Sequence, residues 1–154
     1  MNKNITFIIN GEPMAKQRPR ATSFGKIARV YTPKDTINYE NKVLSCYKDT
    51  LKEHNIDTEQ PLFDRNDLIE VSIVAKFPLV KVDYGKKGLN KSGREKLERK
   101  YCPSKKDADN IAKIVLDGLN GTAYVDDKQV VKLSVVKVYT EDNPMVIVSI
   151  NELV

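Results

Sequence analysis

Aspartates gather in residues 105–130, KKDADNIAKIVLDGLNGTAYVDDKQV, within a segment that otherwise has the pattern of a helix, a turn and a strand. They are Asp107, Asp109, Asp117, Asp126 and Asp127. Where two carboxylates converge to about 4 Å, they repel by about 4 kcal/mol at an effective dielectric constant of about 20, unless a cation or a shared proton lies between them. A converging set of these acids would therefore be a site for a cation.

The helix expected at residues 109–119 sorts its side chains by kind. At about 100° per residue, a single stripe about 100° wide holds all of its polar side chains, which are Asp109, Asn110, Lys113 and Asp117. Asp107 lies just before the first turn, where a carboxylate is favoured. A tight turn and a strand follow the helix, so the chain can fold back and bring Asp126 and Asp127 beside this stripe.

The ligands available for a cation are oxygens. Cys46 and Cys102 are far apart in the sequence and His54 is the only histidine, which excludes a disulfide framework and a CxxC-type zinc site. Oxygen ligands favour Mg²⁺, with Mn²⁺ as the alternative. Such an ion activates water for attack on a phosphodiester. Lys113 fits two roles equally well: contact with the phosphate or the attacking water, or an ion pair within the acidic cluster.

The same residues also fit an ordinary structural explanation. Asp107 is then a helix cap, Asp109 and Lys113 form an ion pair one turn apart, and Asp117 is a solvated neighbour. Paired aspartates before a strand are common turn residues. It is the combination of the motifs that favours a functional site.

Basic residues mark two segments of a chain whose net charge is +5. Residues 13–34 hold six basic residues and no acid, with Phe24 and Tyr31 among them. Residues 81–106 hold ten basic and three acidic residues. This composition suits phosphate contacts and stacking on bases. The DNA-binding residues expected from it are Lys16, Arg18, Arg20, Lys26, Arg29, Lys105 and Lys106.

The 154 residues suit a single domain, residues 1–154. Strands are expected at 5–10, 68–77, 130–139 and 145–153, a hairpin or an irregular loop at 21–32, and a helix from Thr32-Pro33 to about His54. The result is an α/β (α+β) fold, a mixed β-sheet with two main helices. The Lys-rich residues 81–106 are expected to be an insertion loop that carries a short helix at 92–100 and orders on DNA.

The chain lacks an apolar run of the length of a signal peptide or a membrane span. A cytoplasmic location, without a membrane partner, is therefore expected.

The segment DADNIAKIVLDGLNGTAYVDDKQV resembles the signature of the RusA family of Holliday junction resolvases, small phage-derived endodeoxyribonucleases. In that signature a D-x-D-N-x-x-K helix is followed by a D-D-x-Q-V strand. The resemblance is strong over about 26 residues and looser at VVKLSVVKVY and GEPMAKQRPR.

The resemblance implies a Mg²⁺-dependent crossover junction endodeoxyribonuclease with a RusA-like fold, acting in recombination or repair. It implies that Asp107, Asp109 and Asp127 bind the metal and that Lys113 is catalytic. Asp126, Asn110 and Asp117 are then supporting residues. It also implies a homodimer that cuts opposed strands of a four-way junction in the cytoplasm of a bacterial or phage-infected host cell.

Two other functions remain open at this point. One is a non-catalytic, structure-selective DNA-binding protein in which the aspartates form an ion-pair network around Lys113. The other is a transferase that uses DxD to bind a cation and a nucleotide, although the chain has no glycine-rich phosphate loop.

Overall fold

A computed structural model describes residues 2–25 and 27–154 of the chain. Its elements in chain order are β1 (Asn4–Asn10), β2 (Arg20–Phe24), β3 (Ile27–Tyr31), α1 (Lys34–Glu53), β4 (Leu68–Pro78), η1 (Lys81–Asp83), β5 (Tyr84–Gly85), β6 (Gly88–Leu89), α2 (Lys91–Arg99), α3 (Ala108–Leu119), η2 (Asp127–Gln129), β7 (Val130–Thr140) and β8 (Met145–Leu153).

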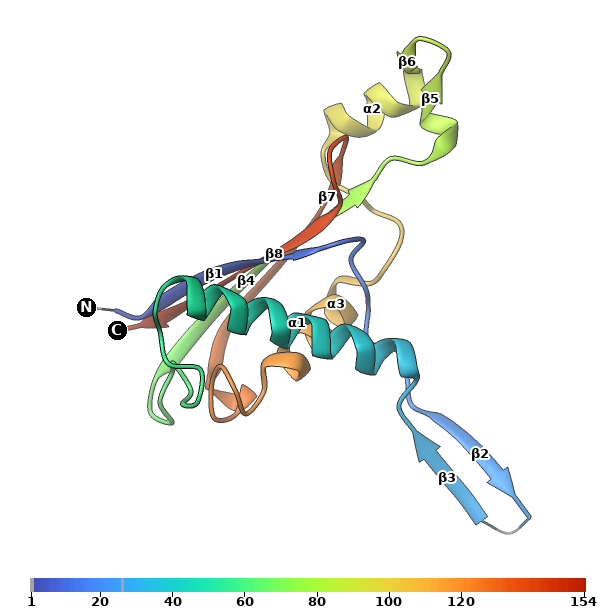
Figure 1. Cartoon of the computed structure of the whole chain (residues 1–154). Helices are drawn as coiled ribbons and strands as arrows, with labels where there is room; N and C mark the ends of the chain where they lie inside the picture. Colours follow the sequence, from blue (N-terminus) through green and yellow to red (C-terminus); the bar gives the residue numbers. More distant parts are fainter. Residues whose placement is uncertain (1, 26) are drawn as a thin grey trace.

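The centre of the molecule is a mixed four-stranded sheet with the order β1-β8-β4-β7 (Figure 1). Strands β4 and β7 are parallel, while the β1–β8 and β8–β4 pairs are antiparallel. The parallel pair needs a long crossover connection, which contains α2 and α3. The prediction of an α+β fold with a mixed sheet and two main helices, α1 and α3, is confirmed.

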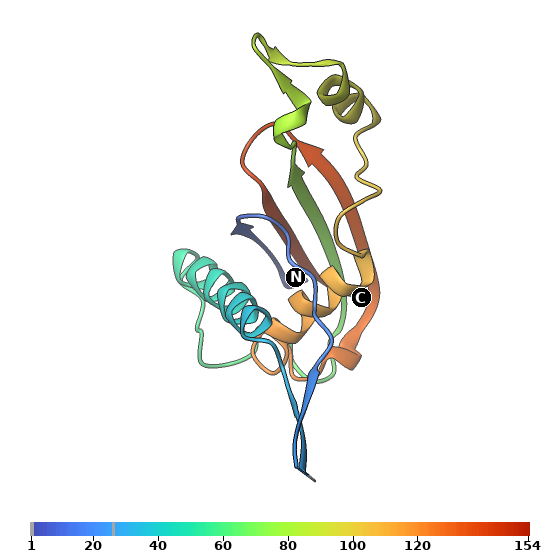
Figure 2. The same cartoon turned by 90° about the vertical axis from the view of Figure 1, so that its right-hand side faces the viewer.

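One face of the sheet forms the core. Every second residue is buried along β1 and β4 and along β8 as far as Ile150, as the period of two in a strand requires. Helices α1 and α3 lie against this face (Figure 2). Tyr39, Val43, Tyr47 and Leu51 of α1 are buried at a spacing of four residues, which is one face of a helix.

The opposite face of the sheet carries an apolar row that runs across all four strands. The pairing register aligns Ile8, Ile147, Val74 and Val136. Ile8 is 47% exposed and Val136 is 36% exposed. No helix of the described residues covers this face (Figure 2).

Helices α1 and α3 approach each other closely at Gly118. A Cβ atom at this position would lie 2.9 Å from the carbonyl oxygen of Glu40 and 3.1 Å from Cβ of Val43. The absence of a side chain therefore lets the backbones meet. This contact fixes α3 on the sheet with its polar stripe facing outward.

Two segments project from this body (Figure 1). The first is the β2–β3 hairpin, which decides between the two expectations for residues 21–32. The second is residues 81–106, called the lobe below. It contains α2, close to the short helix predicted at 92–100, and it also contains η1, β5 and β6, so it has more secondary structure than the expected insertion loop.

Helix α1 begins one residue later than predicted. Pro33 occupies the cap position rather than the first helical position, and it offers no side-chain hydrogen bond. The helix ends at Glu53, as expected from the sequence.

Among the described residues, no helix is both long enough and apolar enough to cross a membrane.

Candidate active site

Helix α3 presents the predicted polar stripe at the surface. Asp109 and Lys113 are exposed and Asn110 and Asp117 are half-buried, while Ile111, Ile114, Val115 and Leu119 are buried on the opposite side. The sorting predicted from the helical period is confirmed. The stripe lies where a ligand can reach it.

The structure lacks two contacts that the ordinary structural explanation requires among the described residues: a capping hydrogen bond to the side chain of Asp107 and an ion pair between Asp109 and Lys113. Asp107 is the N-cap residue of α3, yet its side chain makes no capping hydrogen bond to an amide of the described residues. Its Oδ2 instead accepts a long hydrogen bond, of 3.5 Å, from the side-chain Nδ2 of Asn110. Lys113 forms no ion pair with Asp109 or with another acid among residues 2–25 and 27–154. Asp107, Asp109 and Lys113 are therefore available for a ligand.

Residues 16–19 of the basic segment lie beside this stripe. The backbone N–H of Lys16 donates to the carbonyl of Asn110 at 2.8 Å and so ties the segment to α3. The two parts enclose a cleft of about 460 Å³. Its lining residues are Lys16, Gln17, Arg18, Pro19, Asp107, Asp109, Asn110, Lys113 and Asp117. Acidic and basic groups thus share one cleft.

Lys16 holds the two sides of the cleft together. Its Nζ pairs with the carboxylate of Asp117 at 3.1 Å and with Glu40 of α1. Partial burial alone would lower the pKa of Lys16, but the two carboxylates raise it above its usual value. Lys16 is therefore a charged clamp between the segment, α1 and α3. Asp117, which the sequence placed near Lys113, has Lys16 as its partner.

Asp126 and Asp127 return to α3 through a tight connection. The turn passes through Gly121 at φ +79°, and the buried Tyr124 donates its hydroxyl hydrogen to the carbonyl of Leu116 at 2.9 Å. Partial burial and the charges of Asp126 and Asp117 raise the pKa of Asp127. Asp127 is therefore close enough to α3 for the charge of Asp117 to raise its pKa, although Asp127 does not line the cleft.

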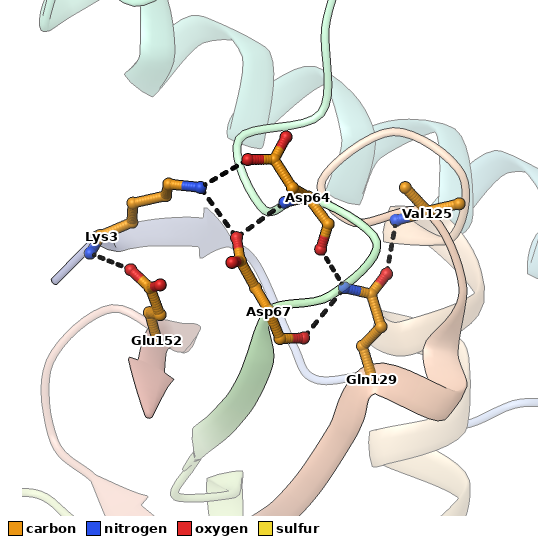
Figure 3. A network of polar contacts seen from close by, with 6 residues as sticks. All are labelled: Lys3, Asp64, Asp67, Val125, Gln129 and Glu152. Carbon is orange, nitrogen blue, oxygen red and sulfur yellow. Dashed lines mark hydrogen bonds and ion pairs between the residues drawn. The ribbon is translucent and has the colours of Figure 1, made fainter. Parts of the chain in front are cut away.

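Gln129 fixes the loop that carries these two aspartates (Figure 3). Its Oε1 accepts the backbone N–H groups of Val125 and Asp126, at 2.9 and 3.0 Å. Its Nε2 donates to the carbonyls of Asp64 and Asp67, at 2.6 and 3.0 Å. The side chain is buried and all four of its hydrogen bonds go to backbone groups.

Lys3 supports the far side of the same network (Figure 3). Its Nζ pairs with Asp64 at 3.0 Å and with Asp67 at 2.8 Å. This closes the turn whose carbonyls Gln129 binds. Sequence reasoning assigned no role to Gln129 or Lys3. Two signals were available for Gln129: its place in the D-D-x-Q-V motif and its polar character directly before the strand VVKLSVV.

The acids fit a metal in ligand type. Oxygen ligands of this kind suit a hard divalent cation. The pKa of Asp127 is raised by desolvation first and then by the neighbouring acids Asp126 and Asp117, whose charge a cation would neutralise. Within residues 2–25 and 27–154, however, no three His, Cys, Asp or Glu side chains lie close enough together to hold an ion. Asp107, Asp109 and Asp127 as metal ligands thus stay a prediction.

The predicted DNA-binding residues lie at three places. Arg18 lines the cleft with Lys113. Arg20 and Arg29 are exposed on the β2–β3 hairpin, and Lys105 and Lys106 are exposed directly before Asp107. Lys26 lies outside the described residues. Their contacts with DNA remain predictions.

Comparison with known proteins relates the whole chain to one family. Residues 10–151 match the family described as Endodeoxyribonuclease RusA. A protein of Bacillus subtilis (strain 168) that bears the name "Uncharacterized protein YqaN" is 30% identical over 149 residues, which are 97% of this chain and 96% of that protein. The match extends far beyond the segment of 26 residues that carries the motif. The chain belongs to the RusA family of endodeoxyribonucleases.

Proposed function

We propose that the protein is a Mg²⁺-dependent endodeoxyribonuclease that cuts four-way DNA junctions by hydrolysis of one phosphodiester in each of two opposed strands. Mn²⁺ is the alternative ion. The observation that carries the proposal is the cleft at α3, where Lys113 and Arg18 lie with Asp107 and Asp109 and where Lys113 has no ion-pair partner among the described residues.

Asp107, Asp109 and Asp127 would hold the cation. A bound cation lowers the pKa of water and neutralises charge on the phosphoryl oxygens. Asp126 supports the position of Asp127, since its carboxylate accepts the N–H of Lys128 at 2.9 Å and so caps the turn. Asn110 and Asp117 keep the α3 stripe in place through the segment at Lys16.

Lys113 contacts the scissile phosphate in this proposal. It lies one turn beyond Asp109 on the same exposed stripe. A lysine whose charge is not neutralised by a neighbour can stabilise the charge that develops on the phosphoryl oxygens during attack. Arg18 lies on the opposite wall of the cleft and provides a second positive group for the DNA backbone.

The protein acts as a homodimer in this proposal, in the cytoplasm of a bacterial or phage-infected host cell. Two opposed strands present two symmetry-related phosphates, which need two related sites. The uncovered face of the sheet is the surface assigned to the second copy. Its apolar row is exposed at both ends, at Ile8 and Val136, and sheets pair well along such faces.

The proposal is tested with labelled four-way junctions and plain duplex, incubated with Mg²⁺ and the wild-type chain, Asp109→Asn or Asp127→Asn. We expect paired nicks in the junction with the wild-type chain alone. Both variants should lose more than about 100-fold in rate, because each removes a charge from the site, while they still bind the junction. Lys128→Ala, which changes an exposed neighbour of Asp127, is the control and should cut normally.

A second class of function predicts a different result. A non-catalytic DNA-binding protein would bind junctions but would cut none of them with either Mg²⁺ or Mn²⁺. That outcome would rule out the enzyme and leave family membership intact.

A further inference from the structure

The lobe, residues 81–106, is built around a buried carboxylate. Asp83 has no exposed surface. Its two oxygens accept the N–H of Val80 at 2.9 Å, the hydroxyl of Ser92 at 2.7 Å and the ammonium of Lys96 at 2.9 Å. Burial alone would raise the pKa of Asp83, but these donors bring it down to about 2. The centre of the lobe is therefore an ionised, fully bonded group.

The backbone closes tightly around Asp83. The carbonyl of Asp83 accepts the N–H of Asn90, and a Cβ atom on Gly93 would lie 2.6 Å from that carbonyl oxygen. Asn90 caps α2 through the N–H of Gly93 at 3.1 Å. These contacts fix the start of α2 against η1. The lobe is therefore already ordered, and the free energy of binding does not have to offset the entropy cost of ordering it.

The outer surface of the lobe is strongly basic. Of its three acids, Asp83 is neutralised by Lys96, and Glu95 lies 3.9 Å from Lys91 in an i,i+4 pair. The remaining acid is Glu98. The exposed basic residues without an ion pair among the described residues are Lys81, Lys86, Lys87, Arg94, Arg99, Lys100, Lys105 and Lys106.

The lobe is joined firmly to the body next to the candidate site. Cys102 N–H donates to the carbonyl of Lys137, and Tyr139 N–H donates to that of Lys100, each at 2.9 Å. Lys96 lies over the ring of Tyr139, 5.6 Å from its centre. The chain then runs through Lys105 and Lys106 directly to Asp107, at the start of α3.

The lobe and the β2–β3 hairpin lie on opposite sides of α3. In Figure 1 both project from the α3 side of the molecule, the lobe upward and the hairpin downward, and Figure 2 shows α3 between them. Two basic projections therefore flank one acidic cleft. Such an arrangement matches a polyanion that enters the cleft at one point and continues past it in two directions.

We infer that the lobe is a second DNA-binding surface, which grips the phosphate backbone of a duplex arm that leads away from the cut site. The inference rests on the proposed function and adds to it a requirement for arm length. The lobe reads backbone charge and not bases, since it offers lysines and arginines on a rigid support. Affinity should then depend on whether the arm is long enough to reach it.

The test uses junctions with arms of about 8 and about 20 base pairs, which are roughly 27 and 68 Å long at 3.4 Å per base pair. The variant is Lys86→Ala/Lys87→Ala, at the turn between β5 and β6. The matched control is Lys48→Ala/Lys52→Ala, which removes the same charge from the far end of α1 (Figure 1). Dissociation constants are measured for both junctions over a range of salt concentrations.

For the wild-type chain we expect tighter binding of the long-arm junction than of the short-arm one. Lys86→Ala/Lys87→Ala should reduce this preference by about 3-fold to 10-fold and lower the salt slope on long arms by up to about 1.8, because each lost phosphate contact removes about 0.9. Lys86→Arg/Lys87→Arg keeps the charge and should restore the preference. The control should match the wild-type chain.

Equal preference for long and short arms in the wild-type chain, or an unchanged preference in Lys86→Ala/Lys87→Ala, would overturn the lobe as an arm-binding surface even if the junction is cut normally. Binding without cutting would overturn the proposed function while the arm preference is still read from affinity. Failure to bind any junction would overturn both.

Discussion

At the scale of single residues, the charges around α3 fall into two groups. Lys16, Asp117 and Glu40 neutralise one another and hold the cleft together. Asp107, Asp109 and Lys113 have no such partners among the described residues and face solvent. The first group holds the basic segment, α1 and α3 together, and the second group is available to bind substrate. The structure pairs Lys16 with two carboxylates, and its expected contact with DNA stays a prediction.

Asp127 provides a prediction about pH. Its pKa is raised from 3.8 on folding by partial burial and by Asp126 and Asp117, so ionisation of Asp127 destabilises the folded chain. The destabilisation is absent at low pH, where the group is protonated in both states, and it develops as the pH rises through 3.8 and beyond. Because Asp127 is exposed and solvent screens its charge, Asp127→Asn should melt only slightly higher than the wild-type chain at neutral pH without metal.

The measurement is thermal unfolding from pH 3 to pH 7, with and without Mg²⁺. The advantage of Asp127→Asn should shrink towards the acidic end of this range. Added Mg²⁺ should raise the melting temperature of the wild-type chain more than that of the variant. A variant that melts well below the wild-type chain at neutral pH would show that Asp127 is held by a stabilising contact.

At the scale of elements, a single side chain sets the position of a whole loop. Gln129 bonds the amides of Val125 and Asp126 on one side and the carbonyls of Asp64 and Asp67 on the other. The loop with Asp126 and Asp127 is thereby joined to the turn that precedes β4. Gln129 acts as a positioning residue, since it reaches the site through the backbone.

Gln129→Ala should have two separate effects. Loss of four buried hydrogen bonds should destabilise the chain by about 2–3 kcal/mol. Displacement of the loop should lower the cleavage rate at saturating junction by about 10-fold to 100-fold and raise the Mg²⁺ concentration needed for half-maximal rate. The rate is measured well below the melting temperature of the variant. A destabilised variant with a normal rate and a normal Mg²⁺ requirement would contradict the positioning role.

The same scale shows what sequence reasoning can reach. The helix at 109–119, its polar stripe and the four long strands follow from hydrophobic periods, which are local. The partner of Asp117 does not, because Lys16 lies about one hundred residues away in the chain and meets α3 only in the folded molecule, where its backbone N–H also bonds to Asn110. The order within the lobe was also underestimated. Its centre is the buried charged residue Asp83, whereas a segment rich in charged residues is expected to be solvated.

At the scale of the whole molecule, the sheet has one covered face and one open face. The open face carries the row Ile8, Ile147, Val74 and Val136, and beside it a row of hydroxyls that includes Thr6 and Ser149, which lie 2.9 Å apart. A face of this kind can pack against the same face of a second copy, with the two copies related by a two-fold axis. This is the surface that the proposed homodimer would use.

Ile8→Lys should weaken that dimer. A buried ammonium without a partner is costly, so the variant should be monomeric at concentrations where the wild-type chain is dimeric. Analytical ultracentrifugation measures the change, and Asn41→Lys on the exposed side of α1 is the control. The monomeric variant should give single nicks in place of paired ones. A variant that remains dimeric would place the dimer contact elsewhere.

The polar centre of the lobe has a consequence for how the chain tolerates change. Within the lobe only Cys102 joins the apolar core of the body. The lobe leaves and rejoins the body near the ends of β4 and β7, where Pro78 is followed by η1 and Tyr101 bridges to Val138. These two strands are direct neighbours in the sheet and lie only about 4.8 Å apart. A short connection between these two ends can therefore take the place of the lobe, and we expect the pairing of β4 with β7 to tolerate changes in its length.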